Sequence, residues 1–217
     1  MEKYSIIRPS RDEKIIGMNY SSVHPHPDCF REGVNILHRF KINKFIELDQ
    51  ELKFTLSRGA NLCDVMKEST ISAAGLLISE RFAKFLMPYN LGIGLHKFYN
   101  AHIYSLAAMQ NYYWLQFIWD KSKDIVDYKN TTFFVINNRN EKNILNISNN
   151  EEYCGEKEKI GKNRSILFEK IKFTNPPIFD IFLLPLRGYI IVGERLKTDI
   201  QNAGFTGIEF LESPIEP

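Results

Sequence analysis

Short apolar runs followed by segments of helical periodicity recur along the chain, and one such combination occurs twice. The first copy covers residues 75–99 and the second covers residues 188–210. Their most similar parts are LLISERF, which begins at Leu76, and IIVGERL, which begins at Ile190. An apolar run, a polar junction, a helical face and a turn with glycine predict a strand, a helix and a second strand in each copy.

The polar junctions carry residues that helix starts favour. Ser79 can accept a hydrogen bond from a free backbone N–H group, and Glu80 and Glu194 place negative charge where the helix dipole attracts it. We expect the arginine after each glutamate to lie on the outer face of its helix. Pro88 and Gly204 predict the helix ends. The apolar positions of the first helix repeat on one face, at Phe82, Phe85, Leu86 and Tyr89.

Period-two patterns predict further strands outside the two copies. The strongest is 112–119, where both faces are apolar enough to be at least half-buried. Other segments expected to be extended are 4–7, 35–42, 45–56 with a turn near Asp49, 131–136, 166–173 and 178–184. A short helix is expected at 64–66. Two polar stretches are expected to be loops, 19–28 and 137–164, the second with a short helix.

These elements define a fold class. Strands outnumber helices, and no segment is rich enough in Pro, Gly or Ser to separate domains. We therefore expect a single α+β domain over residues 1–217. Its sheet should be mainly antiparallel with a few short helices, and it should contain two related strand–helix–strand halves, at about residues 75–104 and 188–212.

Composition narrows the functional classes. The chain has 28 basic and 26 acidic residues, and this balance argues against a dedicated nucleic-acid binder, which concentrates positive charge. No apolar run approaches the ~18 residues that cross a bilayer, and the N-terminus lacks the apolar region of a secretory signal. Cys29, Cys63 and Cys154 lack metal or redox spacing and are expected to be reduced thiols. We expect a cytoplasmic protein that does not bind a membrane.

Residues that could carry chemistry form no recognised motif. The nearest approach to a metal set is His24, His26, Cys29 and His38, but structural zinc sites use tighter spacing, so a proline-rich turn is favoured. Neither Ser57 nor Ser79 has the G-x-S-x-G context of a nucleophile. The sequence therefore predicts no catalytic residue, no cofactor and no metal.

The order and spacing of several blocks resemble a family of small bacterial immunity proteins of polymorphic toxin systems, formerly described only as a domain of unknown function. The blocks cover most of the chain: YSIIRPSRDEKIIG from Tyr4, ANLCDVM from Ala60, LLISERF from Leu76, HKFY from His96, YYWLQF from Tyr112, DIVDYKNTTFFV from Asp124 and IIVGERLKTDIQNAGFTGIEF from Ile190. Cys63 and Gly193 stand where the family pattern has Thr and Ser, so no role is assigned to those side chains.

The resemblance implies a cytoplasmic protein without catalysis that binds and neutralises a cognate toxin domain, encoded by the adjacent gene. It implies no toxin-contact residues, because immunity surfaces diverge with their targets. Loops are the usual carriers of such specificity. Our candidate contact regions are therefore residues 20–31 and 137–164. The candidate partner-binding residues in them are Tyr20, His24, His26, Arg31, Arg139, Glu141, Glu151 and Glu152.

Two other classes of function remain open at this point. The first is a small hydrolase or nuclease-like enzyme with a dispersed site, for which His96, His102, Glu80 and Arg81 would have to converge in one pocket. The second is a nucleic-acid or small-ligand binding module that stacks its ligand on Tyr112, Tyr113 and Trp114. Exposure of two or more of these rings would support the second alternative.

Overall fold

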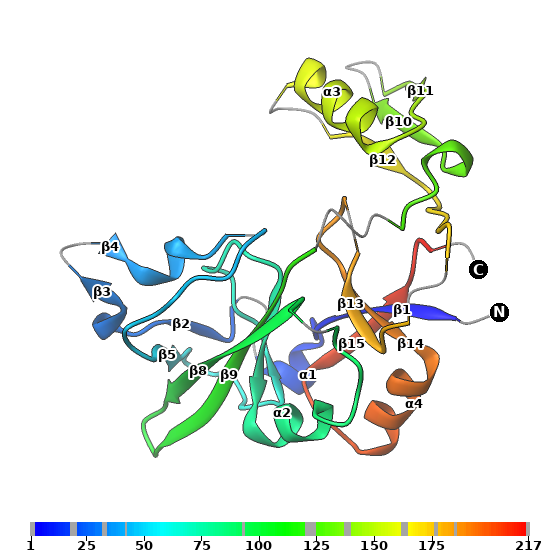
Figure 1. Ribbon diagram of the computed structural model, residues 1–217. Helices are drawn as coiled ribbons and strands as arrows, with labels where there is room; N and C mark the ends of the chain where they lie inside the picture. Colours follow the sequence, from blue (N-terminus) through cyan, green and yellow to red (C-terminus); the bar gives the residue numbers. More distant parts are fainter. Residues whose placement is uncertain are drawn as a thin grey trace. The chain divides into compact units, whose positions relative to one another are not determined.

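The computed structural model describes residues 3–17, 21–31, 34–41, 43–92, 94–119, 125–136, 140–161, 165–175, 178–184 and 186–215, with the backbone alone at 30, 31, 34 and 35. The chain divides into two compact units. Unit 1 contains Met1–Lys3, Lys121–Ile178 and Ser213–Pro217, and unit 2 contains Tyr4–Asp120 and Phe179–Glu212. Mostly antiparallel strands combine with helices, so the α+β class is confirmed (Figure 1).

The larger sheet of unit 2 has the order β2-β5-β8-β9-β7-β6. Its strands are β2 (Val23–Pro25), β5 (Leu52–Leu56), β6 (Val65–Met66), β7 (Gly75–Ser79), β8 (His96–Tyr104) and β9 (Met109–Phe117). Neighbouring strands are antiparallel except β5 and β8, which are parallel. The helix α2 (Glu80–Leu86) follows β7 without a loop. Shorter elements of the same unit are α1 (Glu13–Ile16), η1 (Pro27–Cys29), β3 (Phe30–Arg31), β4 (Val34–Asn35) and η2 (Ile36–Arg39).

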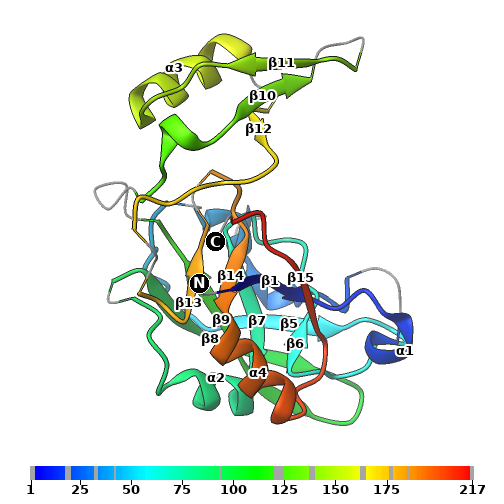
Figure 2. The same cartoon turned by 90° about the vertical axis from the view of Figure 1, so that its right-hand side faces the viewer.

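The smaller sheet of unit 2 has the order β13-β14-β1-β15 and is antiparallel throughout. Its strands are β1 (Tyr4–Pro9), β13 (Ile181–Leu183), β14 (Ile190–Gly193) and β15 (Ile208–Glu212), and α4 (Glu194–Asn202) follows β14. In both sheets the strand before the helix and the strand after it are separated by one antiparallel strand. That middle strand is β9 in the larger sheet and the N-terminal β1 in the smaller one. The two helices lie next to each other at one end of unit 2 (Figure 2).

Two apolar cores hold unit 2 together. The first covers one face of the larger sheet, where Phe54, Ile103 and Trp114 pack with Leu37 and Phe40. The second lies on the opposite face and joins the sheets. Its members include Leu76, Leu115, Phe82 and Leu86 from the first copy and Ile190, Val192 and Leu196 from the second. The apolar face predicted for the first helix is thus confirmed as its buried face at Phe82 and Leu86.

A buried carboxylate ties the first copy to the second. Asp64 stands directly before β6, and its side chain is only 11% exposed. It accepts hydrogen bonds from Ser79 Oγ at 2.8 Å and from the backbone N–H of Thr206 at 3.0 Å. The guanidinium of Arg81 lies 3.7 Å away. Because Ser79 starts α2 and Thr206 follows α4, this carboxylate holds the two copies at a fixed distance. We call this arrangement the Asp64 joint.

A second carboxylate repeats the arrangement with the copies exchanged. Asp180 stands directly before β13 and accepts from Arg195 at 2.7 Å and from the backbone N–H of Asn90 at 2.8 Å. We call this arrangement the Asp180 joint. Each arginine also stacks on a ring of the opposite copy: Arg81 on Phe205 at 4.4 Å, and Arg195 on Tyr89 at 5.4 Å. The arginines are exposed, as expected, but they also bind across the joints. The relation of the copies as two halves stays a prediction.

Unit 1 is built around a three-stranded sheet of order β11-β10-β12. Its elements are η4 (Tyr128–Asn130), β10 (Phe133–Ile136), β11 (Lys142–Leu145), α3 (Asn150–Ile160) and β12 (Leu167–Phe168). Tyr153 of α3 packs on Phe133 and Tyr128, with ring centroids 5.7 and 6.3 Å apart. Phe168 closes this aromatic core against Phe133. Each unit has its own core. The expectation of one domain over the whole chain stays a prediction.

Local sequence signals predict many elements of the fold and fail for several others. Ser79 caps α2 by accepting from the N–H of Phe82, and Gly204 has φ +65° just beyond α4, as predicted. Residues 64–66 are not a helix but lead into β6, because β-branched Val65 pairs with Ile78 of β7. Within the range 35–42 predicted as a strand, Asn35 ends β4, and Ile36–Arg39 form the 3-10 helix η2. The expected loops contain β2 and β11, whose pairing depends on distant strands.

Replacing Gly75 by alanine should destabilise unit 2. A Cβ atom at this position would lie 2.4 Å from Trp114 Cζ2 and 2.7 Å from the carbonyl oxygen of Leu115, so the sheet would have to shift. Such overpacking costs about 1–3 kcal/mol. Gly155→Ala is the matched control, because no atom lies within 4 Å of its Cβ and helix α3 favours alanine by about 0.5–1 kcal/mol. Urea unfolding followed by circular dichroism measures both, and equal stability of the two variants would contradict the packing argument.

Removing the carboxylate of the Asp64 joint should cost more than removing an exposed helix cap. Asp64→Ala removes the acceptor of both Ser79 Oγ and the Thr206 N–H, and each lost part-buried hydrogen bond costs about 0.5–1.5 kcal/mol. Asp12→Ala is the control, because Asp12 caps α1 through one exposed hydrogen bond worth about 1 kcal/mol. Urea midpoints should fall further for Asp64→Ala, and a smaller fall than for Asp12→Ala would refute the joint's role.

Candidate functional site

One side of the larger sheet of unit 2 is lined by polar and aromatic side chains. Helix α2 lies against β7 and β9, and the alternation of β8 places Asn100, His102 and Tyr104 on the same side of the sheet, nearer β5. The register sets Lys53 beside His102 and Asn111 opposite it. We call this surface the open face. It consists of His26, Asp28, Glu51, Lys53, Asn100, His102, Tyr104 and Asn111, all half-buried or exposed.

His102 occupies the middle of the open face and is fixed through both ring nitrogens. Its Nε2 lies 2.7 Å from Glu51 Oε2, and its Nδ1 lies 3.1 Å from Asn111 Oδ1. The imidazole side chain is 16% exposed, so its orientation is set by these contacts and not by solvent. The hydrogen bond from His102 holds the pKa of Glu51 below its usual value.

A second cluster lies beside the first, toward β2. Lys53 Nζ donates to Asp28 Oδ2 at 2.7 Å, which lowers the pKa of Asp28 and raises the pKa of Lys53. His26 packs on the ring of Tyr104 with centroids 4.8 Å apart, and its Nδ1 lies 3.6 Å from Asp28 Oδ1. The open face therefore presents rings and charges whose positions are already constrained by their neighbours.

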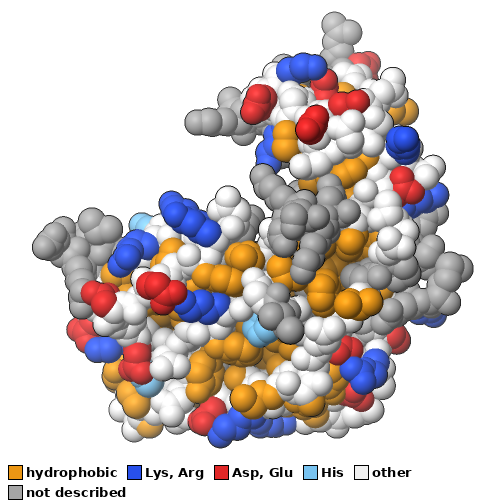
Figure 3. Space-filling view, viewed as in Figure 1, with side chains coloured by type: hydrophobic (Ala, Val, Ile, Leu, Met, Phe, Trp, Pro, Cys, Tyr) orange, Lys and Arg blue, Asp and Glu red, His pale blue; other side chains and the backbone are white. Residues whose placement is uncertain are grey.

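The open face continues into apolar surface at two borders. Toward α2, His96 and Tyr113 both contact the Phe98 ring edge to face, at 5.7 and 6.2 Å. Figure 3 shows hydrophobic side chains gathered over this part of unit 2, with charged and histidine side chains at its left. At the other border, the β8–β9 hairpin ends in Leu106 and Met109, which are exposed.

The candidate partner-binding residues are divided between the two units. His26 lies on the open face, and His24 is exposed on β2, with Nδ1 3.5 Å from Ser57 Oγ. Tyr20 and Arg139 lie outside the described residues, and Arg31 is described in its backbone alone, within β3.

The remaining candidates belong to unit 1. Glu141 is exposed directly before β11, and Glu151 and Glu152 are exposed in the first turn of α3. Glu152 accepts from both the N–H and the hydroxyl of Ser148, which makes it part of the helix cap. His26 thus lies on the open face of unit 2, whereas the acidic candidates lie on unit 1.

The residues proposed for an enzyme are not bonded to one another. Each has its own partner: His96 with the Gly92 carbonyl, His102 with Glu51, Glu80 with Lys84, and Arg81 with Asp64. Within the described ranges, no hydrogen bond or ion pair joins any two of the four. The enzyme alternative stays a prediction.

The rings proposed for base stacking are also unsuited to that task. Tyr112 and Trp114 are 6% and 3% exposed, and the Tyr112 hydroxyl donates to the Cys63 carbonyl. Burial raises the pKa of Tyr112. Only Tyr113 is half-buried. Stacking of a base on two or more of these rings is excluded by this packing.

The described residues offer neither a His and Cys ligand set nor a membrane-spanning helix. Cys29 is buried and donates to the Lys53 carbonyl at 2.9 Å, so it does not combine with His24 and His38 as a ligand set. In the part of the chain that is described, no group of three or more His, Cys, Asp or Glu could hold a metal ion. Among the described helices, none has the length and apolar character needed to cross a bilayer.

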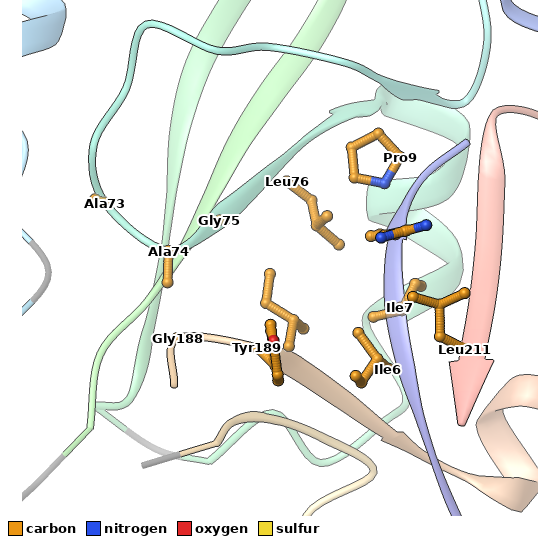
Figure 4. Close-up of a pocket in the computed structure, with 12 residues that line it drawn as sticks. Ile6, Ile7, Pro9, Ala73, Ala74, Gly75, Leu76, Gly188, Tyr189 and Leu211 are labelled. Atoms are coloured by element: carbon orange, nitrogen blue, oxygen red, sulfur yellow. The ribbon is translucent and has the colours of Figure 1, made fainter. Parts of the chain in front are cut away.

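Two hollows lie in unit 2. One of about 300 Å³ opens where the two copies begin, between residues 73–76 and 188–190, with Ile6, Ile7 and Leu211 at its wall (Figure 4). Its charged side chain, Arg8, is already paired with Glu209 at 3.0 Å. The other, of about 350 Å³, lies between residues 47–51 and 97–100 and borders the open face. In the second hollow, Lys97 pairs with Glu47 at 2.6 Å.

Sequence reasoning missed most of the open face. Lys53, Tyr104 and Asn111 sit on separate strands, and only the register of β5, β8 and β9 brings them together. Their signal in the sequence is alternation. Lys53 lies between buried Leu52 and Phe54, and Tyr104 directly follows buried Ile103.

The Glu51–His102 pair should make a small, pH-dependent contribution to stability. Because the pKa of Glu51 is lower in the folded chain, the pair stabilises the fold above the ordinary pKa of 4.5 and loses this effect as the pH falls through the folded pKa. Glu51→Gln should therefore lose less stability than the wild type between about pH 6 and about pH 3, by at most ~1 kcal/mol, since Glu51 is half exposed. Urea unfolding at each pH measures this.

The control is the same substitution in a His102→Leu background. There Glu51→Gln should change the pH dependence less, because the largest contribution to the lowered pKa of Glu51 is gone and only weaker ones, such as the Asn100 contact at 3.4 Å, remain. Identical pH profiles for the wild type and Glu51→Gln would show that the pair does not act as described.

Comparison of the sequence with known proteins gives no match. The chain matches no protein-family model, and no curated protein sequence matches it at a significant level. Function is therefore argued from the open face and from the resemblance of the sequence blocks.

Proposed function

We propose that this chain is a non-catalytic immunity protein that binds a bacterial toxin domain in the cytoplasm and neutralises it. The observation that carries the proposal is the open face. It places aromatic rings, histidines and ion pairs on one uncovered side of a sheet that is otherwise packed. The order of the sequence blocks, which resembles immunity proteins, gives the partner class.

The side chains of the open face suit protein recognition. Tyrosine presents a large ring and a hydroxyl at small cost in conformational freedom, and such rings are enriched at interface centres. Tyr104 is half-buried and already packed against His26. Lys53 and Asp28 hold each other at 2.7 Å. Side chains fixed before binding lose less entropy when a partner arrives.

Neutralisation by binding requires only that the partner's working surface be covered. A standard protein interface buries about 800 Å² on each side, and the open face, its hairpin border and the neighbouring hollow at residues 47–51 form one continuous surface. Charges at its edge, such as Glu47 and Glu51, would attract a partner that carries basic residues and speed the encounter. No bond-making step by this chain is needed.

The test uses the toxin-bearing gene that should adjoin this one. Its C-terminal domain is produced separately, and binding to the full chain is measured by calorimetry, with rescue of growth on co-expression as the cellular readout. We expect rescue and tight binding. A domain that binds neither in solution nor in cells would overturn the proposal.

Tyr104→Ala should weaken this binding at least tenfold, which corresponds to about 1.4 kcal/mol. The loss follows because the ring and its packing with His26 would be removed from the open face, beside its hairpin border. Tyr189→Ala is the matched control, since Tyr189 is 40% exposed elsewhere in unit 2, at the hollow of Figure 4. Equal loss in both variants would point to a different contact surface.

A further inference from the structure

The tip of the β8–β9 hairpin has an unusual amino-acid composition for a turn. Hairpin turns favour glycine, asparagine and aspartate, and exposed runs of apolar residues are normally avoided. Here four consecutive apolar residues, Leu106, Ala107, Ala108 and Met109, are all exposed. Leu106 is 111% exposed, the value of a side chain surrounded by solvent, and Met109 is 49% exposed. The fold does not use these side chains.

The tip is nevertheless held firmly. β8 and β9 pair along their whole length, from His96 opposite Phe117 to Tyr104 opposite Met109. Ser105 closes the turn, because its N–H donates to the Ala108 carbonyl at 3.0 Å and its Oγ accepts from the Ala108 N–H at 3.2 Å. The apolar residues are therefore presented on a preorganised backbone, which reduces the entropy lost on binding.

The position of the tip connects it to the open face. Met109 is the cross-strand partner of Tyr104, and Tyr104 carries the His26 ring. An apolar anchor beside a polar, charged border is the arrangement of an interface core and its rim.

We propose that Leu106 and Met109 insert into an apolar recess of the partner protein while the open face contacts the rim of that recess. The inference rests on the proposed function, since the partner is the toxin domain. It adds the chemistry of the site on the partner: a recess lined by aliphatic or aromatic side chains, with basic groups near Asp28 and Glu51.

Two other occupants are less compatible with the surroundings of the tip. A bilayer surface favours lysine and arginine beside the apolar residues, whereas the turn and its flanks, residues 105–111, contain none. A second copy would have to supply the recess from its own surface, such as the hollow of Figure 4, or pack its tip against the first tip. Either contact would give dimers, rings or open chains of molecules, which sedimentation distinguishes from a monomer.

The experiment compares Leu106→Asp and Met109→Asp with Met87→Asp in the full chain. Met87 is the matched control, because it is 80% exposed at the end of α2 and lies outside the hairpin. Affinity for the separately produced domain of the adjacent toxin gene should fall at least tenfold for each tip variant, since burial of such a side chain contributes on the order of 10- to 100-fold. Met87→Asp should change it less than threefold. Circular dichroism should show unchanged unfolding midpoints for all three.

The outcomes separate this inference from the function on which it rests. If the wild type binds the domain and Leu106→Asp binds it equally well, the tip is not the anchor, and the proposed function stands. If the wild type does not bind at all, both fail. Sedimentation that shows wild-type chains self-associating and Leu106→Asp monomeric would overturn the inference in favour of a second copy. Tip-dependent sedimentation with vesicles of phosphatidylcholine and phosphatidylserine would overturn it in favour of a membrane.

Discussion

Two reciprocal carboxylates, Asp64 and Asp180, determine how unit 2 is assembled. A carboxylate taken out of water needs hydrogen-bond donors, and an incomplete set is costly. At each joint the donors come from both copies: Ser79 and the Thr206 N–H for Asp64, and Arg195 and the Asn90 N–H for Asp180. Each carboxylate thus takes one donor from either copy, which ties the two copies together. The second apolar core fills the space that this constraint defines.

The two copies differ in one respect that creates the open face. In the smaller sheet the middle strand is β1, which arrives from the N-terminus and leaves no hairpin. In the larger sheet the middle strand is β9, joined to β8 by the projecting turn, and β5 and β2 extend the sheet beyond β8. Helix α2 lies mainly against β7 and β9. The uncovered side on β5 and β8, together with the apolar tip, thus follows from asymmetry within otherwise similar topologies.

The sequence predicts what depends on neighbouring residues and misses what depends on pairing. Ser79 as a cap and Gly204 as a left-handed residue follow from short-range chemistry, and both predictions are confirmed. The helix predicted at residues 64–66 is absent, because the hydrogen-bond partners of Asp64 lie 15 and 142 positions away along the chain. The open face has the same difficulty: His26 stands out by residue type, but Lys53 and Tyr104 become neighbours only through the parallel register of β5 and β8. The apolar turn was detectable, as a hydrophobic run between two predicted strands.

The joints and the open face use different residues, so substitutions on the open face would alter the surface without removing the joints. The joints and cores set stability, and substitutions there remove hydrogen-bond partners. On the open face, Asp28 pairs with Lys53 and Glu51 lies within hydrogen-bond distance of His102, so both carboxylates already have a partner in the free chain. A partner that covers one of these carboxylates must keep it hydrogen-bonded or paired. A buried charge without a partner costs more free energy than one good contact contributes. Discrimination would therefore come from exclusion of mismatched partners, while the apolar tip supplies attraction that many recesses could accept.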